Sequence, residues 1–272
     1  TLFCKLSTRK QRRILFILSN TQLHKGNCLE VMKTIKDNSI DAIITDPPYG
    51  TTACKWDSVI DFEMMWEQLN RIIKPNGAIV LFGSEPFSSA LRMSNIKSYK
   101  YDWIWIKNRP TGTMLAKRQP MRNVENILVF YKSQPKYNRQ MIKRTPEEFK
   151  KSYRRNDSES KNGEQMRHTK NPLIRQSEDR QWYKPPIQTL HYNSDSKRNG
   201  KSHPTQKPIA LMEYLIKTYT NENETVLDFT MGSGSTGVAA KNLNRNFIGI
   251  EQDQKYFSTA TERIKEVEYK LF

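Results

Sequence analysis

Short apolar runs alternate with amphipathic stretches from about Gln22 to Tyr131. Residues 62–73 carry apolar side chains at helical intervals, and Pro75-Asn76-Gly77 predicts the end of that helix. The runs rich in apolar, aromatic or β-branched residues predict four buried strands, at 41–45, 78–82, 101–106 and 126–131. Strands that alternate with helices are typical of a doubly wound, mainly parallel sheet.

The same alternation resumes from His203 to the end of the chain. It predicts strands at 225–229 and 247–251, with helices at about 206–219, up to about Leu243, and around Tyr256 to Val267. A glycine-rich turn separates the strand at 225–229 from the helix that follows it.

Between these two parts, residues 132–201 are poor in apolar side chains and strongly basic. They hold 18 lysine and arginine residues against 8 acidic ones, with aromatic side chains scattered among the charges. Either a disordered linker or a surface that grips a sugar-phosphate backbone fits this composition, and we favour the second. We therefore divide the chain into residues 1–131, a basic insert at 132–201, and residues 202–272.

The overall charge supports a polyanionic partner. The chain of 272 residues has a formal net charge of +17 at pH 7. Each phosphate that a protein cation neutralises releases counterions, so this excess favours nucleic acid, although solubility alone could also explain it. The three cysteines lack CxxC spacing and no apolar run could span a bilayer, so we expect no metal site, no membrane and a cytoplasmic location.

The turn Asp228–Gly237 is a candidate cofactor site. Gly232, Gly234 and Gly237 satisfy the GxGxxG spacing between a strand and a helix, where glycine lets the backbone approach a ligand closely. Glu251 ends the next strand at about the spacing of a ribose-binding carboxylate. A dinucleotide and S-adenosylmethionine both carry adenosine, so this turn alone leaves the cofactor undecided.

A second turn, Asp46-Pro47-Pro48-Tyr49, follows the predicted strand 41–45. Consecutive prolines cannot continue a sheet, so the chain must leave at the strand's carboxyl end, where ligands bind in open α/β sheets. The Asp46 carboxylate and Pro47 carbonyl can accept both hydrogens of an exocyclic amine while Tyr49 stacks on the base. We predict these four residues as catalytic, because the held amine would present its nitrogen to a methyl sulfonium.

At these residues the chain resembles the beta class of DNA amino-methyltransferases, a circularly permuted class in which the catalytic motif precedes the cofactor motif. The resemblance implies S-adenosylmethionine as cofactor, a seven-stranded Rossmann-like sheet with one antiparallel strand, and a target base flipped out of the duplex. It also implies a catalytic half at 1–131, target recognition and DNA binding in the basic insert at 132–201, and a cofactor-binding half at 202–272. Asn27 and Cys28 resemble a motif beside the cofactor adenine, although Asn27 replaces the usual Asp, and His203–Pro208 resembles the segment at the methionine end. The candidate cofactor-binding residues are Asn27, Cys28, Asp46, Thr205, Lys207, Asp228, Phe229, Gly232, Gly234, Ser235, Thr236 and Glu251.

The stretch 107–122 contains five cations and no acidic residue. Because it follows a strand expected to end near the active site, we predict that it clamps DNA phosphates, although a solvated loop would look similar. The predicted DNA-binding residues are Lys107, Arg109, Lys117, Arg118 and Arg122. Glu125 also recurs in the resembled family, but the sequence suggests no physical role for it.

Together these features predict a site-specific methyltransferase that acts on adenine N6 in duplex DNA. The alternatives are methylation of cytosine N4, of RNA or of a protein amide, a catalytically inactive DNA-binding protein, and an NAD-dependent oxidoreductase. N4-cytosine enzymes usually carry Ser in place of Asp46, which favours adenine. The sequence does not decide whether the chain forms a homodimer or has a cognate restriction endonuclease.

Overall fold

A computed structural model describes residues 20–51, 57–149, 182–194 and 206–270. The chain divides into two compact units, one of residues 1–138 with 188–272 and one of residues 139–187. In the smaller unit, β6 (Ile142–Lys143) pairs antiparallel with β7 (Tyr183–Lys184), and Phe149 stacks on Trp182 with ring centroids 4.0 Å apart. The predicted insert at 132–201 contains this unit, and its role in target recognition stays a prediction.

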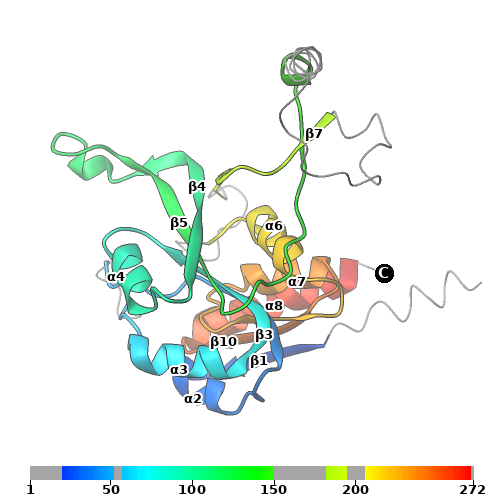
Figure 1. Ribbon diagram of the computed structural model, residues 1–272. Coiled ribbons are helices and arrows are strands. Elements are labelled where there is room, and N and C mark those ends of the chain that lie inside the picture. The colour runs from blue at the N-terminus through cyan, green and yellow to red at the C-terminus, as the bar shows by residue number, and fades with distance from the viewer. Residues whose placement is uncertain (1–19, 52–56, 150–181, 195–205, 271–272) are drawn as a thin grey trace, which may run out of the picture. The chain divides into compact units, whose positions relative to one another are not determined.

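The larger unit is built around one eight-stranded sheet in the order β1-β10-β9-β2-β3-β5-β4-β8 (Figure 1). Only β5 runs antiparallel to its neighbours in this sheet. Its strands are β1 (Thr21–Lys25), β2 (Ile40–Thr45), β3 (Ile73–Gly83), β4 (Tyr99–Thr111), β5 (Arg122–Phe130), β8 (Thr189–Tyr192), β9 (Thr225–Asp228) and β10 (Asn246–Glu251). The predicted α/β sheet with one antiparallel strand is confirmed.

The sheet has one strand more than the seven expected. The additional strand is β8, which comes from the basic middle segment and pairs in parallel with the outer side of β4. The indole nitrogen of Trp105 donates a hydrogen bond to the Tyr192 carbonyl at 2.9 Å, which fixes the end of β8 against β4. Polar neighbours hid this strand from the hydrophobic pattern, since only Leu190 is buried in it.

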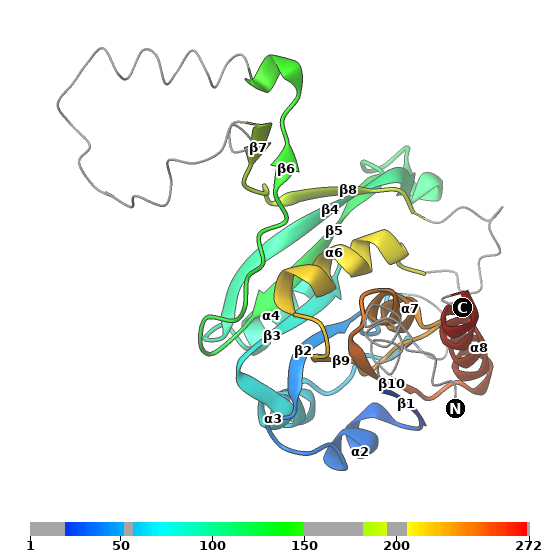
Figure 2. The same ribbon diagram turned by 90° about the vertical axis from the view of Figure 1, so that its right-hand side faces the viewer.

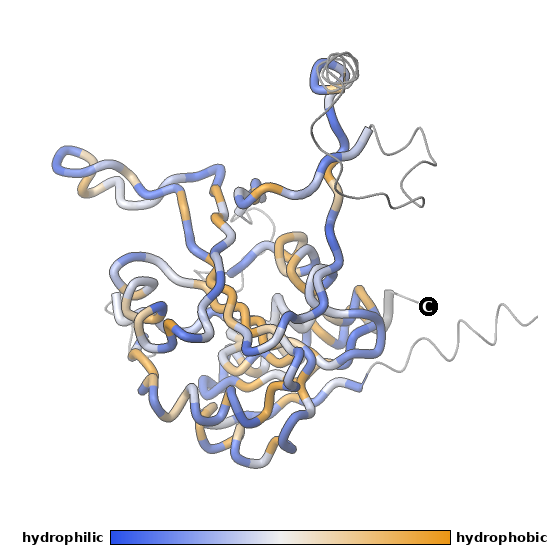
Figure 3. The backbone as a smooth tube through the Cα atoms, viewed as in Figure 1, coloured by the Kyte–Doolittle hydropathy of each residue, from blue (hydrophilic) through white to orange (hydrophobic). Residues whose placement is uncertain are grey.

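Helices cover both faces of the sheet (Figure 2). On one face lie α2 (Cys28–Lys33), α3 (Phe62–Ile72) and α4 (Phe87–Ser94), and on the other lie α6 (Ile209–Tyr219), α7 (Ser235–Asn242) and α8 (Gln254–Lys270). Successive side chains of β2 point to opposite faces of the sheet. Ile43 packs on the face covered by α2, α3 and α4, and Ala42 and Ile44 pack on the face covered by α6, α7 and α8. Apolar positions accordingly concentrate in the sheet and its adjoining helices (Figure 3).

The two central strands β2 and β9 are parallel neighbours, but the chain leaves them toward opposite faces. After β9 it enters α7 on one face, and after β2 it enters α3 on the other. A crevice opens at the carboxyl ends of strands where connections diverge in this way. The fold therefore brings the two chemical turns together, although about 180 residues separate them in the sequence. These are the predicted catalytic turn at 46–49, after β2, and the predicted cofactor turn at 228–237, after β9.

The glycine-rich turn is shaped by helix packing as well as by space for a ligand. Gly234 has φ +79°, and a Cβ there would approach Ala260 Cβ of α8 at 2.9 Å. Gly232 has φ +51° and a Cβ there would meet no atom within 4 Å. The expectation that Gly234 leaves room for the cofactor is wrong in its physical reason, since the space is filled by α8.

We predict that Gly234→Ala destabilises the fold by about 2–4 kcal/mol, because a left-handed backbone and a clash with α8 add together. Gly232→Ala should cost about 1–2 kcal/mol, because it meets the backbone penalty alone. Denaturant unfolding of both variants measures the difference. Equal destabilisation would show that contact with α8 does not limit position 234.

Candidate active site

A cavity of about 860 Å³ lies at the carboxyl ends of the parallel strands. Most of the predicted site residues line it, namely Asn27, Cys28, Asp46, Pro47, Pro48, Tyr49, Lys107, Arg109, Arg122, Lys207, Asp228, Phe229, Gly232, Ser235, Thr236 and Glu251. Gly234, Lys117 and Arg118 are not among the lining residues, and Thr205 lies outside the described residues. The candidate catalytic and cofactor residues are thus brought to one place.

Asp228 ties the two chemical turns together from beneath the cavity. Its carboxylate accepts hydrogen bonds from the hydroxyls of Thr45, at the end of β2, and Thr236, in the first turn of α7. The backbone N–H of Thr230 donates to it at 3.2 Å. The Thr230 hydroxyl in turn donates to the Asp46 carbonyl oxygen at 3.1 Å, so the cofactor turn directly supports the catalytic turn.

Glu251 supports the glycine turn from the neighbouring strand. One carboxylate oxygen accepts the N–H of Gly232 at 2.9 Å and the other accepts the N–H of Asp253 at 2.8 Å. Burial raises the pKa of this carboxyl group. Each oxygen keeps a further lone pair for a ligand, which is compatible with the predicted ribose contact.

Asn27 and Cys28 stand at the start of α2. The Asn27 side chain accepts the Leu29 N–H at 2.9 Å and caps the helix. The departure from Asp to Asn therefore retains the cap without a negative charge. Burial raises the pKa of the Cys28 thiol to about 11, so it lines the cavity as a neutral group.

The turn after β2 is clamped by Asp57, a residue that sequence reasoning did not identify. One Asp57 carboxylate oxygen accepts the backbone N–H groups of Tyr49 at 2.8 Å and Gly50 at 2.9 Å, and the other accepts that of Thr51 at 2.9 Å. Asp57 is buried, at 8% exposure, and its carboxylate accepts hydrogen bonds from three N–H groups of the turn. This clamp fixes where Asp46 and Tyr49 present their side chains.

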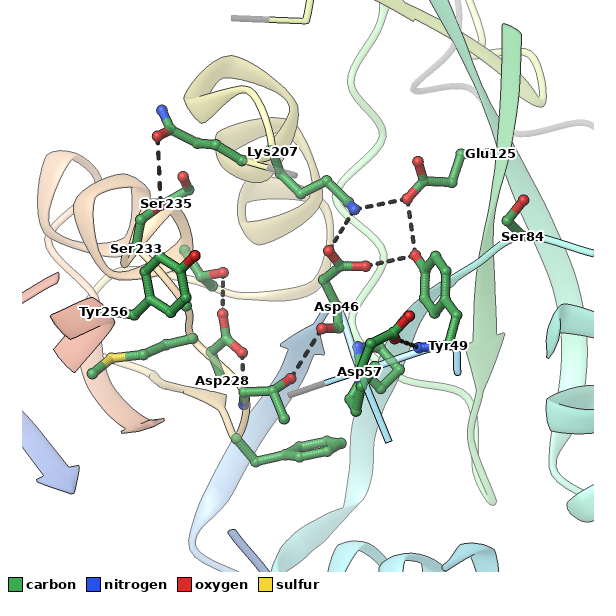
Figure 4. Close-up of a pocket in the computed structure, with 18 of the residues that line it drawn as sticks. Asp46, Tyr49, Asp57, Ser84, Glu125, Lys207, Asp228, Ser233, Ser235 and Tyr256 are labelled. Carbon is green, nitrogen blue, oxygen red and sulfur yellow. Dashed lines mark hydrogen bonds and ion pairs between the residues drawn. The ribbon is translucent and has the colours of Figure 1, made fainter. Parts of the chain in front are cut away.

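Asp46 belongs to a compact ionic network (Figure 4). Its carboxylate accepts the Tyr49 hydroxyl at 2.5 Å and, at its other oxygen, the Lys207 ammonium at 2.5 Å. Lys207 also pairs with Glu125 at 2.8 Å, and Glu125 pairs with Lys107 at 2.5 Å. Carboxylates and ammonium groups thus alternate along a chain of ion pairs, from Asp46 through Lys207 and Glu125 to Lys107. The Tyr49 hydroxyl lies between the two carboxylates, 3.0 Å from Glu125.

The network balances desolvation against attraction. Burial raises the pKa of Asp46, opposed by the charge of Lys207. Burial also disfavours the charged forms of Glu125 and Lys207, but their partners outweigh it, lowering the pKa of Glu125 and raising that of Lys207. Glu125 and Lys207 are therefore held ionised, and Lys207 is the cation that offsets the charge of Asp46.

Tyr49 presents an aromatic surface beside this network. Its ring stacks on Phe87 of α4 with centroids 5.0 Å apart and an interplanar angle of 26°. The Lys207 ammonium lies 5.9 Å from the Tyr49 ring centroid. Phe87 is buried, so it backs the ring and holds its orientation.

The remaining predicted groups divide between the cavity and the β4–β5 hairpin. Lys107 faces the cavity through its ion pair with Glu125. Arg122 donates to the Glu85 carbonyl at 3.2 Å.

Within the described part of the chain, no cluster of three or more His, Cys, Asp or Glu could hold a metal, and no helix has the length and apolar character to cross a membrane.

Comparison with known proteins identifies the family. A family model described as DNA methylase, of the N6 and N4 type, matches residues 40–262. The chain belongs to this DNA methylase family. The match includes both chemical turns and the β4–β5 hairpin, so it covers the ionic network of this DNA methylase as well.

Relatives that are similar in sequence include type II methyltransferases. M.HpaI of Haemophilus parainfluenzae is 30% identical over 253 residues, covering 88% of this methylase and 72% of the relative. M1.MboII of Moraxella bovis is 29% identical over 276 residues, covering 93% and 99%. The predicted membership of the DNA amino-methyltransferases is confirmed.

Solved structures agree with this assignment. A complex of M1.HpyAVI with SAM is 30% identical, with a TM-score of 0.58 over 90% of this chain and 98% of that one. PvuII DNA methyltransferase, which is cytosine-N4-specific, is 17% identical with a TM-score of 0.64 over 93% of both chains. The second likeness shows that the fold is shared.

Sequence reasoning missed Asp57 in the methylase site and gave Glu125 no physical role. Glu125 was visible as the first acid after a long basic stretch, but its contact with Lys207 spans strands far apart in the sequence. Asp57 is separated from Tyr49 by residues whose spacing follows no known motif. Both are recognisable only as buried carboxylates with several donors around them.

We predict that Asp228→Asn flattens the dependence of stability on pH. Burial raises the pKa of Asp228 from its ordinary value of 3.8 to about 6. The folded state therefore binds more protons than the unfolded state between about pH 4 and 6, and the free energy of unfolding falls as pH rises through that window. Denaturant unfolding from pH 4 to 7 measures the slope, and an unchanged slope in the variant would contradict the assignment.

Proposed function

We propose that this chain transfers a methyl group from S-adenosylmethionine to N6 of an adenine flipped out of duplex DNA. The observation that carries the proposal is the Asp46 carboxylate and Pro47 carbonyl at the end of β2, beside the glycine-rich turn. Within the described residues no hydrogen bond is made to the Pro47 carbonyl oxygen, so it can accept an amine hydrogen.

The cavity residues suit the cofactor. Ser235 Oγ is buried and has no hydrogen-bond partner within the described residues, although it lines the cavity at the start of α7. Such a group needs a polar ligand, and the N-terminus of α7 adds free backbone N–H groups. Ser235, Gly232 and Glu251 would hold the cofactor, whose sulfonium supplies an activated methyl group.

The chain's own residues would orient the acceptor. Adenine N6 is a poor nucleophile because its lone pair is delocalised into the ring. Asp46 and the Pro47 carbonyl would fix both N–H hydrogens, and Tyr49 would stack on the base. Asp46 opposes the positive charge that develops on nitrogen and is the base nearest to the proton that the product must lose.

Adenine is favoured over cytosine by Asp46 itself, because the N4-cytosine enzymes of the resembled class usually carry Ser at this position. The size and charge of the segment 132–201 favour DNA over a protein acceptor. The presence of Asp46, Tyr49 and the turn glycines speaks against an inactive binding protein. A nicotinamide oxidoreductase would leave the amine-binding turn without a role.

We expect radiolabelled methyl groups from S-adenosylmethionine to enter unmethylated duplex DNA and to be recovered as N6-methyl-2′-deoxyadenosine. Digestion to nucleosides followed by chromatography measures the product. Recovery as N4-methyl-2′-deoxycytidine would retain the amine chemistry and overturn the target base. Label in RNA or protein alone would overturn the DNA substrate.

Asp46→Ala should lower kcat by at least about a thousandfold, because the amine loses its oriented acceptor and the compensating charge. DNA affinity should change little, since phosphate contacts carry most of it. Glu67→Ala, which removes an exposed acid of α3, is the matched control and should leave both unchanged. A parallel loss of DNA affinity in Asp46→Ala would contradict the assigned role.

Substitutions around Asp46 should move the acidic limb of the kcat/KM pH profile in opposite directions. Lys207→Met removes an attractive cation, so the pKa of Asp46 rises and the limb shifts to higher pH. Glu125→Gln removes a repulsive anion, so the limb shifts to lower pH. Lys207→Arg should stay near the wild type, and shifts of the same sign in the first two variants would exclude Asp46 as the titrating group.

A further inference from the structure

The hairpin formed by the ends of β4 and β5 projects from the sheet (Figure 1). Its arms pair at Ile106 with Val124 and at Thr111 with Arg122. Every residue from Asn108 to Val124 is exposed, so no other described part of the chain buries this hairpin. Its arms pair with each other and are joined to the rest of the chain at their base, where Arg122 donates to the Glu85 carbonyl and Ser194 donates to Asn108. The side chains beyond these contacts are available to a partner.

The tip of the hairpin, residues 112–119, has a defined backbone. Gly112 takes φ +89°, and the short helix η1 (Thr113–Leu115) follows it. The N–H of Leu115 donates to the Gly112 carbonyl at 2.9 Å, and the N–H of Arg118 donates to the Leu115 carbonyl at 2.8 Å. These bonds hold the tip as a closed turn that presents its side chains outward.

Apolar side chains occupy this turn although the surrounding hairpin is polar (Figure 3). Met114 is 98% exposed and Leu115 is 45% exposed. Lys117 and Arg118 follow after one alanine, and no acidic residue occurs between positions 107 and 122. Exposed apolar side chains surrounded by cations match a partner with anionic edges and an apolar interior, which describes a base-paired duplex.

The hairpin also borders the cavity that would receive the base. Arg109, Pro110 and Thr111 of β4 and Arg122 and Val124 of β5 line it. A duplex held at the mouth of this cavity therefore lies against the hairpin. When a base leaves the stack, it opens a gap that apolar side chains can fill.

We infer that the hairpin tip enters the DNA duplex beside the target base, with Met114 and Leu115 filling the gap in the stack and Lys117 and Arg118 gripping the adjacent phosphates. This inference rests on the proposed transfer to a flipped-out base. Methionine is unbranched and adapts its shape to an irregular gap, which suits it to this position. The tip thereby stabilises the extrahelical base without touching it.

The test uses the full chain, S-adenosylmethionine and two unmethylated duplexes. Both duplexes contain the sequence that the chain methylates. One duplex is fully paired, and in the other the target base faces an abasic site, so that less stacking and pairing is lost on flipping. The double variant Met114→Ala, Leu115→Ala should lower the single-turnover rate on the paired duplex at least about tenfold. On the abasic duplex its rate should come within about twofold of the wild type.

Two controls accompany this comparison. Met93→Ala removes a methionine that is 69% exposed on α4 and should match the wild type on both duplexes. The double variant Lys117→Ala, Arg118→Ala should weaken binding to both duplexes equally and reduce its salt dependence, because phosphates are present in both.

Equal loss on both duplexes in the methionine–leucine variant, or no loss on either, would overturn the insertion of the tip. Fluorescence of 2-aminopurine at the target position gives an independent readout, and a signal as strong in the variant as in the wild type would also overturn it. A wild-type chain that methylates neither duplex would instead overturn the proposed function.

Discussion

The arrangement of the site depends on one buried carboxylate. Asp228 ends β9 and accepts hydrogen bonds from Thr45, Thr236 and the Thr230 backbone, and so joins the end of β2 to the beginning of α7. Its desolvation is unfavourable, and three donors offset that cost. Because the cofactor turn and the catalytic turn share this anchor, their separation is fixed before any ligand arrives.

Above this anchor, charge balance governs the chemistry. In the proposed reaction Asp46 would carry negative charge to stabilise a developing cation, yet burial opposes that charge. Lys207 supplies the compensation, and Glu125 keeps Lys207 in place through a second ion pair. The proposed methyl transfer to a neutral amine would thus rely on a buried pair of opposite charges, with Tyr49 linking Asp46 to Glu125.

Local patterns in the sequence predicted six of the eight strands of the sheet, the two turns and their order, because hydrophobic period, proline pairs and glycine spacing act over a few residues. The ionic network could not be predicted, because Glu125 meets Lys207 only after β5 has paired into the sheet. The physical role of Gly234 was assigned wrongly because α8 follows it by about twenty residues, and its packing is a tertiary contact. β8 escaped notice because an edge strand with one buried residue lacks a clear alternation.

The return of the chain into the sheet as β8 has a consequence for how such enzymes diversify. The catalytic unit completes its core without residues 139–187, which form a compact unit of their own. The residues of the carboxylate anchor and the ionic network all lie outside that unit, so sequence drift or exchange within it leaves them unchanged. On the proposed division of labour, target preference can therefore change through this unit while the chemistry of the site is retained.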